Sequence, residues 1–299
     1  MLRDRRRLRV GPLSVALMGG GFRGAYDGVP IVAAFSTRRL RAAYAGNLLR
    51  IRRDADDAEA NFGYTANGDL DTAAIATWLG ASAGYVVTWY DQSGNGRNAT
   101  QANKVAQPEY VASAQNSLPV LRCSANGFLS LSGTALDIFQ NVDYGAVLFA
   151  GSASAAHRND IVYYSRGGST AAVRFLFGVG FSTLNRLSLV VRRLDTDAVA
   201  SISSSVDAPA GWALAVAEMA WGTRAGRVLQ NGVAVAENLT LTTAGNTSNT
   251  PSELFSILGV AGTAGLQGDC GELVITNSTW SDAVRLGAET ATNAYWDIY

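Results

Sequence analysis

Histidine, lysine and cysteine are almost absent from this sequence. Its 299 residues include one histidine, His157, one lysine, Lys104, and two cysteines, Cys123 and Cys270. A single histidine and two distant thiols cannot build a zinc centre, so we expect no metal and no cofactor. Two alternatives stay open for the cysteines: buried free thiols, as is usual in a reducing cytoplasm, or one disulfide across the fold.

Charge is scarce as well, since only 16% of the residues are charged and the 24 basic and 24 acidic residues cancel. A balanced charge provides no overall field for nucleic acid or for an anionic membrane, so we expect neither as a partner. The sequence also lacks a run of about 20 apolar residues that could span a membrane. The apolar stretch after Gly11 is too short for a secretion signal, and we expect the N-terminal segment to be retained.

The first residues form a basic segment, in which five arginines within ten residues face one acid, Asp4. These arginines are Arg3, Arg5, Arg6, Arg7 and Arg9. Two interpretations stay open, because such a segment can bind an acidic surface of a neighbouring subunit or remain solvated. Together with the glycines that follow, it predicts an attachment arm over residues 1–28 and one folded body over residues 29–299.

Short apolar runs separated by turn residues make up most of the chain, which is 48% hydrophobic and holds 32 glycines. From Val120 to Thr276, strand-sized runs alternate with Gly, Asn, Ser and Asp, and Asn231-Gly232 has the composition of a tight hairpin turn. This pattern predicts an all-β sandwich.

Three short helices are expected beside the strands. Ser36 can cap a helix through Tyr44, and Ser281 can cap a terminal helix through Trp296. Between them, a helix is expected to begin at Asp71 or Thr72, run through Leu79 and end at Gly80.

The most informative block is an aromatic strand that runs directly into a loop. Residues 86–90 are β-branched or aromatic, as in a packed strand, and the sequence continues Asp91-Gln-Ser-Gly-Asn-Gly-Arg-Asn98. Asp, Ser and Asn can cap such a loop, and the glycines can adopt positive φ. Asn95-Gly96 predicts a type I′ hairpin turn.

This block, Trp89-Tyr-Asp-Gln-Ser-Gly-Asn-Gly96 followed by Asn98-Ala-Thr-Gln101, resembles a block of concanavalin A-like jelly-roll domains. Two groups carry it: the catalytic domain of the fungal α-L-arabinofuranosidase B family, and phage virion proteins, chiefly tail-associated ones. The similarity begins near residue 34 and returns at 257–260 and 266–275. It implies a jelly-roll sandwich of two antiparallel sheets with a few short helices and an N-terminal arm.

A glycosidase needs two carboxyl groups, and the arabinofuranosidase resemblance implies where they belong. The family's acid/base aspartate follows the strand that reads Ile257-Leu-Gly here, where the chain continues Val260-Ala-Gly-Thr263 without an acid. The nucleophilic glutamate belongs to the strand that reads Leu189-Val-Val-Arg-Arg-Leu194, again without one, and the family's adjacent cysteine pair is missing. We therefore predict no catalytic residue. Unaligned acids could still meet in a cleft; these are Asp160, Asp195, Asp269 and Glu272.

The same loop offers the chemistry of a sugar site, because lectin-like sandwiches stack an aromatic ring on a sugar and hold its hydroxyls with Asp, Asn and Gln. The candidate glycan-binding residues are Trp89, Tyr90, Asp91, Gln92, Asn95 and Asn98. The alternative is that the aromatic residues belong to the core and the polar ones cap their own loop.

A cluster of four acids between Asp54 and Glu59 also has two interpretations. Oxygen-rich clusters suit calcium, but the spacing of a calcium loop is missing. The cluster follows Arg50, Arg52 and Arg53, and we expect these arginines to neutralise it on a solvated hairpin.

The sequence-based hypothesis is a phage virion structural protein, located in the virion as a tail, fibre or capsid-attached component and serving host attachment. Its expected partners are other virion proteins, host-surface carbohydrate and further copies of the chain in a homo-oligomer. The alternative is a glycoside hydrolase of the arabinofuranosidase type.

Overall fold

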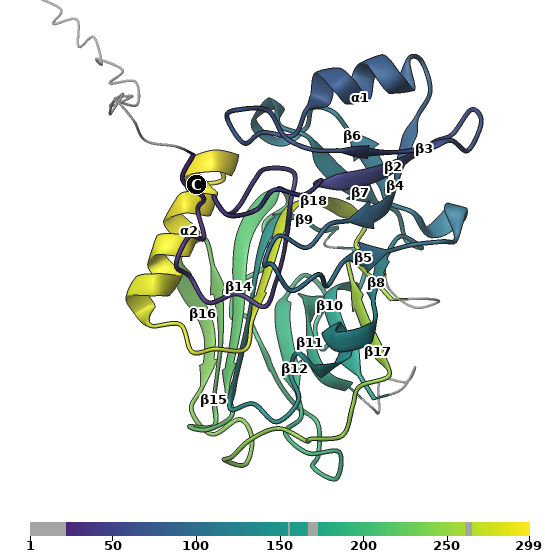
Figure 1. Cartoon of the computed structure of the whole chain (residues 1–299). Coiled ribbons are helices and arrows are strands. Elements are labelled where there is room, and N and C mark those ends of the chain that lie inside the picture. Colours follow the sequence, from purple (N-terminus) through teal and green to yellow (C-terminus); the bar gives the residue numbers. More distant parts are fainter. Residues whose placement is uncertain (1–21, 155, 167–172, 261–264) are drawn as a thin grey trace, which may run out of the picture.

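The computed structural model describes residues 22–154, 156–166, 173–260 and 265–299 (Figure 1). The five arginines of the predicted arm, Arg3, Arg5, Arg6, Arg7 and Arg9, lie outside the described residues. The division into an arm and a body at residue 28 therefore stays a prediction. Residues 22–28 are described, and Tyr26 among them is fully buried.

Two antiparallel layers form the body, and the predicted all-β sandwich is confirmed. The first layer runs, in order of neighbours, through β16 (Val233–Asn238), β15 (Ala225–Gln230), β14 (Trp212–Ala220), β9 (Tyr144–Ser152) and β18 (Gly268–Thr276). The far side of β18 pairs with β1 (Ala33–Ser36) and β7 (Val120–Cys123). The second layer runs through β13 (Ala200–Ser203), β12 (Leu187–Val191), β11 (Val173–Val179), β10 (Asn159–Ser165), β17 (Leu254–Ile257), β8 (Leu129–Leu131) and β5 (Ala99–Thr100).

Strand β4 (Gly84–Trp89) connects the two layers. It pairs with β5 of the second layer, and it also pairs with β2 (Leu49–Arg53) and β6 (Glu109–Val111). Strand β6 continues to β7 and so to the first layer, while β2 pairs with β3 (Glu59–Phe62). Short 3-10 turns lie in the connections at η1 (Lys104–Ala106), η2 (Gln115–Ser117) and η3 (Gly133–Asp137). The aromatic strand that the sequence predicts therefore joins the two layers of the sandwich through β5 and β6.

The main apolar core lies between the layers. Phe139 stacks on Phe175 with ring centroids 4.7 Å apart, and Trp89 packs against Phe35 at 5.6 Å. A second apolar cluster lies on the opposite face of the first layer, where helix α2 (Asp282–Trp296) covers the sheet (Figure 1). Burial of these large side chains, at about 1.5–3 kcal/mol each, is the main stabilisation of the fold.

Local signals placed two of the three expected helices. Helix α1 (Thr72–Leu79) begins after Asp71, whose carboxylate accepts a hydrogen bond from the amide of Ala74. Helix α2 begins after Ser281, whose side chain caps the amide of Val284. The Asn231-Gly232 hairpin is also present, with φ of 51° and 77°.

The helix expected over residues 36–44 was wrong. Ser36 ends strand β1 instead, and its hydroxyl donates to the carbonyl of Gly271 rather than capping a helix. The backbone that follows is held by Gln92, whose side chain accepts from the amide of Leu40 and donates to the carbonyl of Arg38. Partners far away in the sequence thus replace the hydrogen bonds that a helix would have made.

The type I′ turn expected at Asn95-Gly96 was wrong as well. Such a turn needs positive φ at both central residues. Gly94 and Gly96 have positive φ, whereas Asn95 does not. The connection between β4 and β5 is instead a wider loop, which is organised around the side chain of Asp91.

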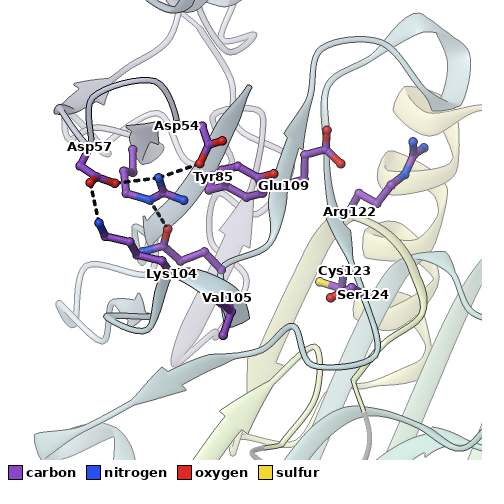
Figure 2. A pocket seen from close by; sticks show the side chains of 11 residues that line it. Asp54, Asp57, Tyr85, Lys104, Val105, Glu109, Arg122, Cys123 and Ser124 are labelled. Atoms are coloured by element: carbon purple, nitrogen blue, oxygen red, sulfur yellow. Dashed lines mark hydrogen bonds and ion pairs between the residues drawn. The ribbon is translucent and has the colours of Figure 1, made fainter. Parts of the chain in front are cut away.

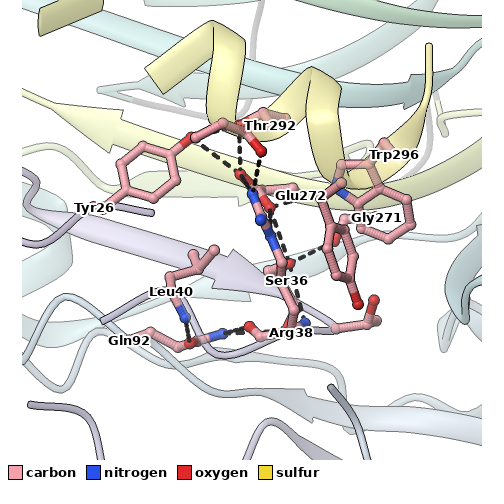
Figure 3. Close-up of polar contacts among 12 residues, drawn as sticks. Tyr26, Ser36, Arg38, Leu40, Gln92, Gly271, Glu272, Thr292 and Trp296 are labelled. Atoms are coloured by element: carbon pink, nitrogen blue, oxygen red, sulfur yellow. Dashed lines mark hydrogen bonds and ion pairs between the residues drawn. The ribbon is translucent and has the colours of Figure 1, made fainter. Parts of the chain in front are cut away.

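A buried ion pair fastens the beginning of the described chain to its end (Figure 3). Arg38 Nε donates to Glu272 Oε2 at 2.8 Å, and the Glu272 side chain is fully buried in β18. The hydroxyls of Tyr26 and Thr292 donate to Glu272 Oε1 at 3.0 and 2.8 Å, and Ser36 Oγ donates to Oε2. One carboxylate therefore joins the N-terminal segment, β1, β18 and α2.

Helix α2 lies so close to the sheet that we expect Gly271→Ala to be destabilising. A Cβ at this position would lie 2.3 Å from the ring of Trp296, which is buried. Overpacking of this kind costs about 1–3 kcal/mol, so thermal unfolding should occur several degrees lower.

The matched control is Gly287→Ala in helix α2 itself, where an added Cβ meets nothing within 4 Å. This change should raise the stability by up to about 1 kcal/mol because alanine favours a helix. Equal melting temperatures for the two variants would contradict the close packing.

Candidate functional site

The loop predicted to bind glycan is held together by its own side chains. Asp91 is buried, and its carboxylate accepts hydrogen bonds from the amides of Ala34, Ser93 and Arg97, each at 2.9 Å. The same carboxylate accepts from Ser93 Oγ at 2.7 Å, and Asn98 Oδ1 accepts from the amide of Asp91. The capping alternative therefore describes the observed contacts of Asp91 and Asn98.

Trp89 and Gln92, two further candidates, are also buried. Trp89 belongs to the main core, and the Gln92 side chain is bonded to the backbone of residues 36–40. Tyr90, at the start of the loop, is partly exposed, and Asn95, in its middle, is exposed. Glycan binding by this loop stays a prediction, which in the observed conformation rests on Tyr90 and Asn95.

A cleft lies on the part of the sandwich built by β2, β4, β6 and β7, near the start of β4, whereas this loop follows the end of β4 (Figure 2). It encloses about 640 Å³. Its lining residues are Arg52, Asp54, Asp57, Tyr85, Lys104, Val105, Gln107, Glu109, Arg122, Cys123 and Ser124. This volume falls in the range of sites that hold small ligands, and a single aromatic ring among polar groups suits a sugar better than an apolar compound.

Arg52 organises one wall of the cleft. Its Nε donates to Gln107 Oε1 at 2.9 Å, and its Nη1 donates to Asp54 and to Asp57, each at 3.0 Å. The guanidinium also lies over the ring of Tyr85, 5.0 Å from the centroid. Because only 6% of the Arg52 side chain is exposed, this wall is preorganised rather than mobile.

Lys104 and Asp57, which both line the cleft, form an ion pair whose charged atoms lie 2.6 Å apart (Figure 2). The hydrogen bond from Lys104, together with the charges of Lys104 and Arg52, holds the pKa of Asp57 below its ordinary value despite partial desolvation. Asp57 therefore stays ionised at any pH near neutrality. Ion pairs with arginines and with Lys104 neutralise the acidic cluster, and neutralisation by the arginines was the expectation from the sequence.

The unaligned acids that could have met in one cleft do not share one. Each is bound by a different arginine: Asp160 by Arg158, Asp195 by Arg174, Asp269 by Arg122 and Glu272 by Arg38. Of these, Asp160 has a raised pKa, because burial outweighs the charge and hydrogen bond of Arg158. None of the four carboxyl groups lines the cleft described above.

The two segments in which the arabinofuranosidase resemblance places carboxylates, residues 189–194 and 260–263, contain no acid. Val190 on β12 and Val260 after β17 belong to one buried cluster with Tyr163, Val173 and Leu176. This cluster covers the face of the second layer that points away from the main core. Residues 261–264, which continue the second of these segments, lie outside the described residues.

The cysteines Cys123 and Cys270 are free and buried, on the neighbouring strands β7 and β18. Burial raises the pKa of both thiols. Of the two alternatives left open by the sequence, the structure has the free thiols. No helix within the described ranges is long and apolar enough to cross a membrane.

Part of the chain is similar to arabinofuranosidases. The family model described as "Alpha-L-arabinofuranosidase B, catalytic" matches residues 24–128. A probable α-L-arabinofuranosidase B of Aspergillus clavatus is 40% identical over 77 residues, which are 25% of this chain and 15% of that protein. An α-L-arabinofuranosidase of Hypocrea jecorina is 37% identical over 76 residues, again 25% of this chain and 15% of that protein. The similarity is distant and covers a small part of those proteins.

Solved structures show the same fold over most of the chain. A crystal structure of an arabinofuranosidase in complex with arabinofuranosyl-α-1,2-xylobiose superposes with a TM-score of 0.66 at 17% identity, covering 89% of this chain and 63% of that one. A GH54 α-L-arabinofuranosidase soaked with a cyclic sulfate inhibitor has the same TM-score at 15% identity and the same coverage. Identities this low carry the fold alone.

These findings correct the predicted role. The matching family and the relatives of named activity are fungal arabinofuranosidases, so the prediction of a phage tail, fibre or capsid-attached protein was wrong. The predicted location in a virion was wrong with it. The predicted partners, which were other virion proteins, host-surface carbohydrate and further copies of the chain, are tested by none of these observations and stay predictions.

The sequence analysis singled out the acidic cluster and Arg52, which line part of the cleft, but it did not predict the cleft. Arg52, Tyr85, Glu109 and Arg122 each look like ordinary strand residues, and no local motif joins them. They meet because β2, β4, β6 and β7 are neighbours in space. Only the pairing register, which the sequence does not reveal, could have brought them together.

Proposed function

We propose that this chain is a glycoside hydrolase domain of the arabinofuranosidase type, which acts on α-L-arabinofuranosyl groups of a polysaccharide in the cleft. One observation carries the proposal: every residue that lines the cleft lies within residues 24–128, the segment that matches the arabinofuranosidase catalytic family. The sandwich shared with solved arabinofuranosidases supports it further.

Hydrolysis of a glycoside needs one protonated and one ionised carboxyl group. The cleft supplies Asp57, which Lys104 and Arg52 keep ionised, for the second role. Glu109 is the carboxyl group in the cleft for which no ion pair is found among the described residues, and it is our candidate for the proton donor. In this proposal Glu109 protonates the leaving oxygen while Asp57 accepts a proton from the attacking water.

The test is the hydrolysis of 4-nitrophenyl α-L-arabinofuranoside by the whole chain. We expect turnover, and we expect Glu109→Gln and Asp57→Asn each to lower kcat/KM at least about 100-fold, the usual contribution of a general acid or base. Glu237→Gln, an exposed change on β16, is the control and should leave the rate unchanged. Melting temperatures establish that the variants are folded.

A second candidate function is binding of arabinofuranosyl glycan without hydrolysis. The observation that favours it is that the segments 189–194 and 260–263, in which the resemblance places carboxylates, contain no acid, and that Val190 and Val260 within them belong to a buried apolar cluster. Binding of the arabinofuranoside without turnover would select this function. Absence of both binding and turnover would contradict either one.

A further inference from the structure

Five side chains form one continuous row across five neighbouring strands. The pairing register places Arg52 on β2 opposite Tyr85 on β4, and Tyr85 opposite Glu109 on β6. The row then passes from Glu109 to Arg122 on β7, and Arg122 lies opposite Asp269 on β18. Because directly opposite residues of paired strands share a face, all five side chains lie on one side of the sheet.

The row extends well beyond the cleft. Neighbouring strands are spaced by 4.7–4.9 Å, so the distance from Arg52 to Asp269 is about 19 Å. The cleft is lined by the first four residues of the row, and Asp269 continues it past the rim, bound to Arg122 through contacts of 2.7 and 2.9 Å. A single sugar would occupy only a fraction of such a length.

The chemistry of the row suits an uncharged chain. Along it, the guanidinium groups of Arg52 and Arg122 alternate with the carboxyl groups of Glu109 and Asp269, so the row has no stretch of one charge that would attract an ionic ligand. Sugar hydroxyls, in contrast, can donate to the carboxyl oxygens and accept from Arg122. Tyr85 supplies an aromatic ring on the same face, and Arg52 fixes the orientation of that ring.

We infer that this row is a binding track for an extended, uncharged polysaccharide, which lies across the strands from Arg52 to Asp269. The inference rests on the proposed function and specifies its substrate: the cleft takes part of a polymer backbone, from which the arabinofuranosyl groups branch. The sequence-predicted loop, with Tyr90 and Asn95, is not part of the track.

The experiment is calorimetric titration of the whole chain with linear xylobiose and xylohexaose. These probes carry no arabinofuranosyl group, so their binding is independent of whether the chain hydrolyses arabinofuranosides. We expect xylohexaose to bind at least about tenfold more tightly than xylobiose, because only the longer chain spans the track. Equal affinities, or no binding of either probe, would overturn the inference even if arabinofuranosides are hydrolysed.

Variants locate the track. Tyr85→Ala should weaken the binding of xylohexaose about tenfold by removing the stacking ring, whereas Tyr85→Phe should retain it. Tyr299→Ala, which removes an exposed tyrosine ring outside the row, is the matched control and should have no effect. If Tyr90→Ala abolishes binding while Tyr85→Ala does not, the loop is the site and the track is refuted. Tighter binding of polygalacturonate than of xylohexaose would likewise contradict an uncharged ligand.

Discussion

Replacing Glu272 by glutamine should lower the free energy of unfolding by about 3–5 kcal/mol, because it leaves the Arg38 guanidinium buried without a counter-charge. Arg38 lies 2.8 Å from this carboxylate, and both residues are shielded from solvent. Thermal unfolding should therefore occur roughly 10 °C lower. The measurement is calorimetry, with denaturant titration to give the free energy.

Two further variants make this result specific. The double variant Arg38→Met/Glu272→Leu should recover part of the loss, because no uncompensated charge remains. Glu59→Gln removes an exposed ion pair with Arg50, whose atoms lie 2.7 Å apart, and should cost less than about 1 kcal/mol. Equal losses for Glu272→Gln and Glu59→Gln would contradict the role of burial.

The same pair sets a dependence on pH. Burial alone would raise the pKa of Glu272, but the charge of Arg38 and the hydrogen bonds from Arg38, Thr292 and Tyr26 together outweigh it and leave the pKa below its ordinary value. A carboxyl group with a lowered folded pKa stabilises the protein above its unfolded pKa, and this contribution is lost as the pH falls through the folded pKa. We expect the stability of Glu272→Gln to fall less steeply in acid than that of the parent chain.

Replacing Asp91 by alanine should have an effect of similar size, about 4 kcal/mol or more. The change removes the acceptor of three backbone amides and of Ser93 Oγ, and each buried donor left unpaired costs about 1–3 kcal/mol. Asp91→Asn keeps one acceptor oxygen and should retain part of the stability. The readout is denaturant unfolding, with hydrogen exchange at the amides of Ala34 and Arg97.

The control for this loop is Asn95→Ala. Asn95 is exposed, and its side chain donates only to the carbonyl of Val32 and to Ser93 Oγ, so its loss should cost less than about 1 kcal/mol. A folded Asp91→Ala variant of unchanged stability would mean that Asp91 is not the organiser of the loop. Its side chain would then be a candidate for ligand binding after all.

Elements with local signals could be predicted from the sequence. The caps Asp71 and Ser281 lie within three residues of the amides they bind, and Asn231-Gly232 carries its own turn geometry. The helix expected from Ser36 failed because its partners Gly271 and Glu272 lie more than 230 positions away. A hydrogen bond of that range leaves no trace in a short window of sequence.

The site shows the same division. The block from Trp89 to Asn98 was conspicuous because a rigid, self-capped loop constrains every residue in it, and such constraint serves the fold. Tyr85 and Arg122, which line the cleft, are under no such local constraint, since strands tolerate many residue types on an exposed face. Its location follows from strand order, which no residue type encodes.

The position of β18 has a consequence for synthesis. This strand lies between β9 on one side and β1 and β7 on the other, and it carries the carboxylate to which Tyr26 and Arg38 bind. While the chain emerges from the ribosome, β1 stays unpaired until residues 268–276, which form its partner strand, have been made. The nascent chain therefore exposes an unpaired strand edge until β18 has been made, and the N-terminal segment can be fixed only after β18 and α2 are available.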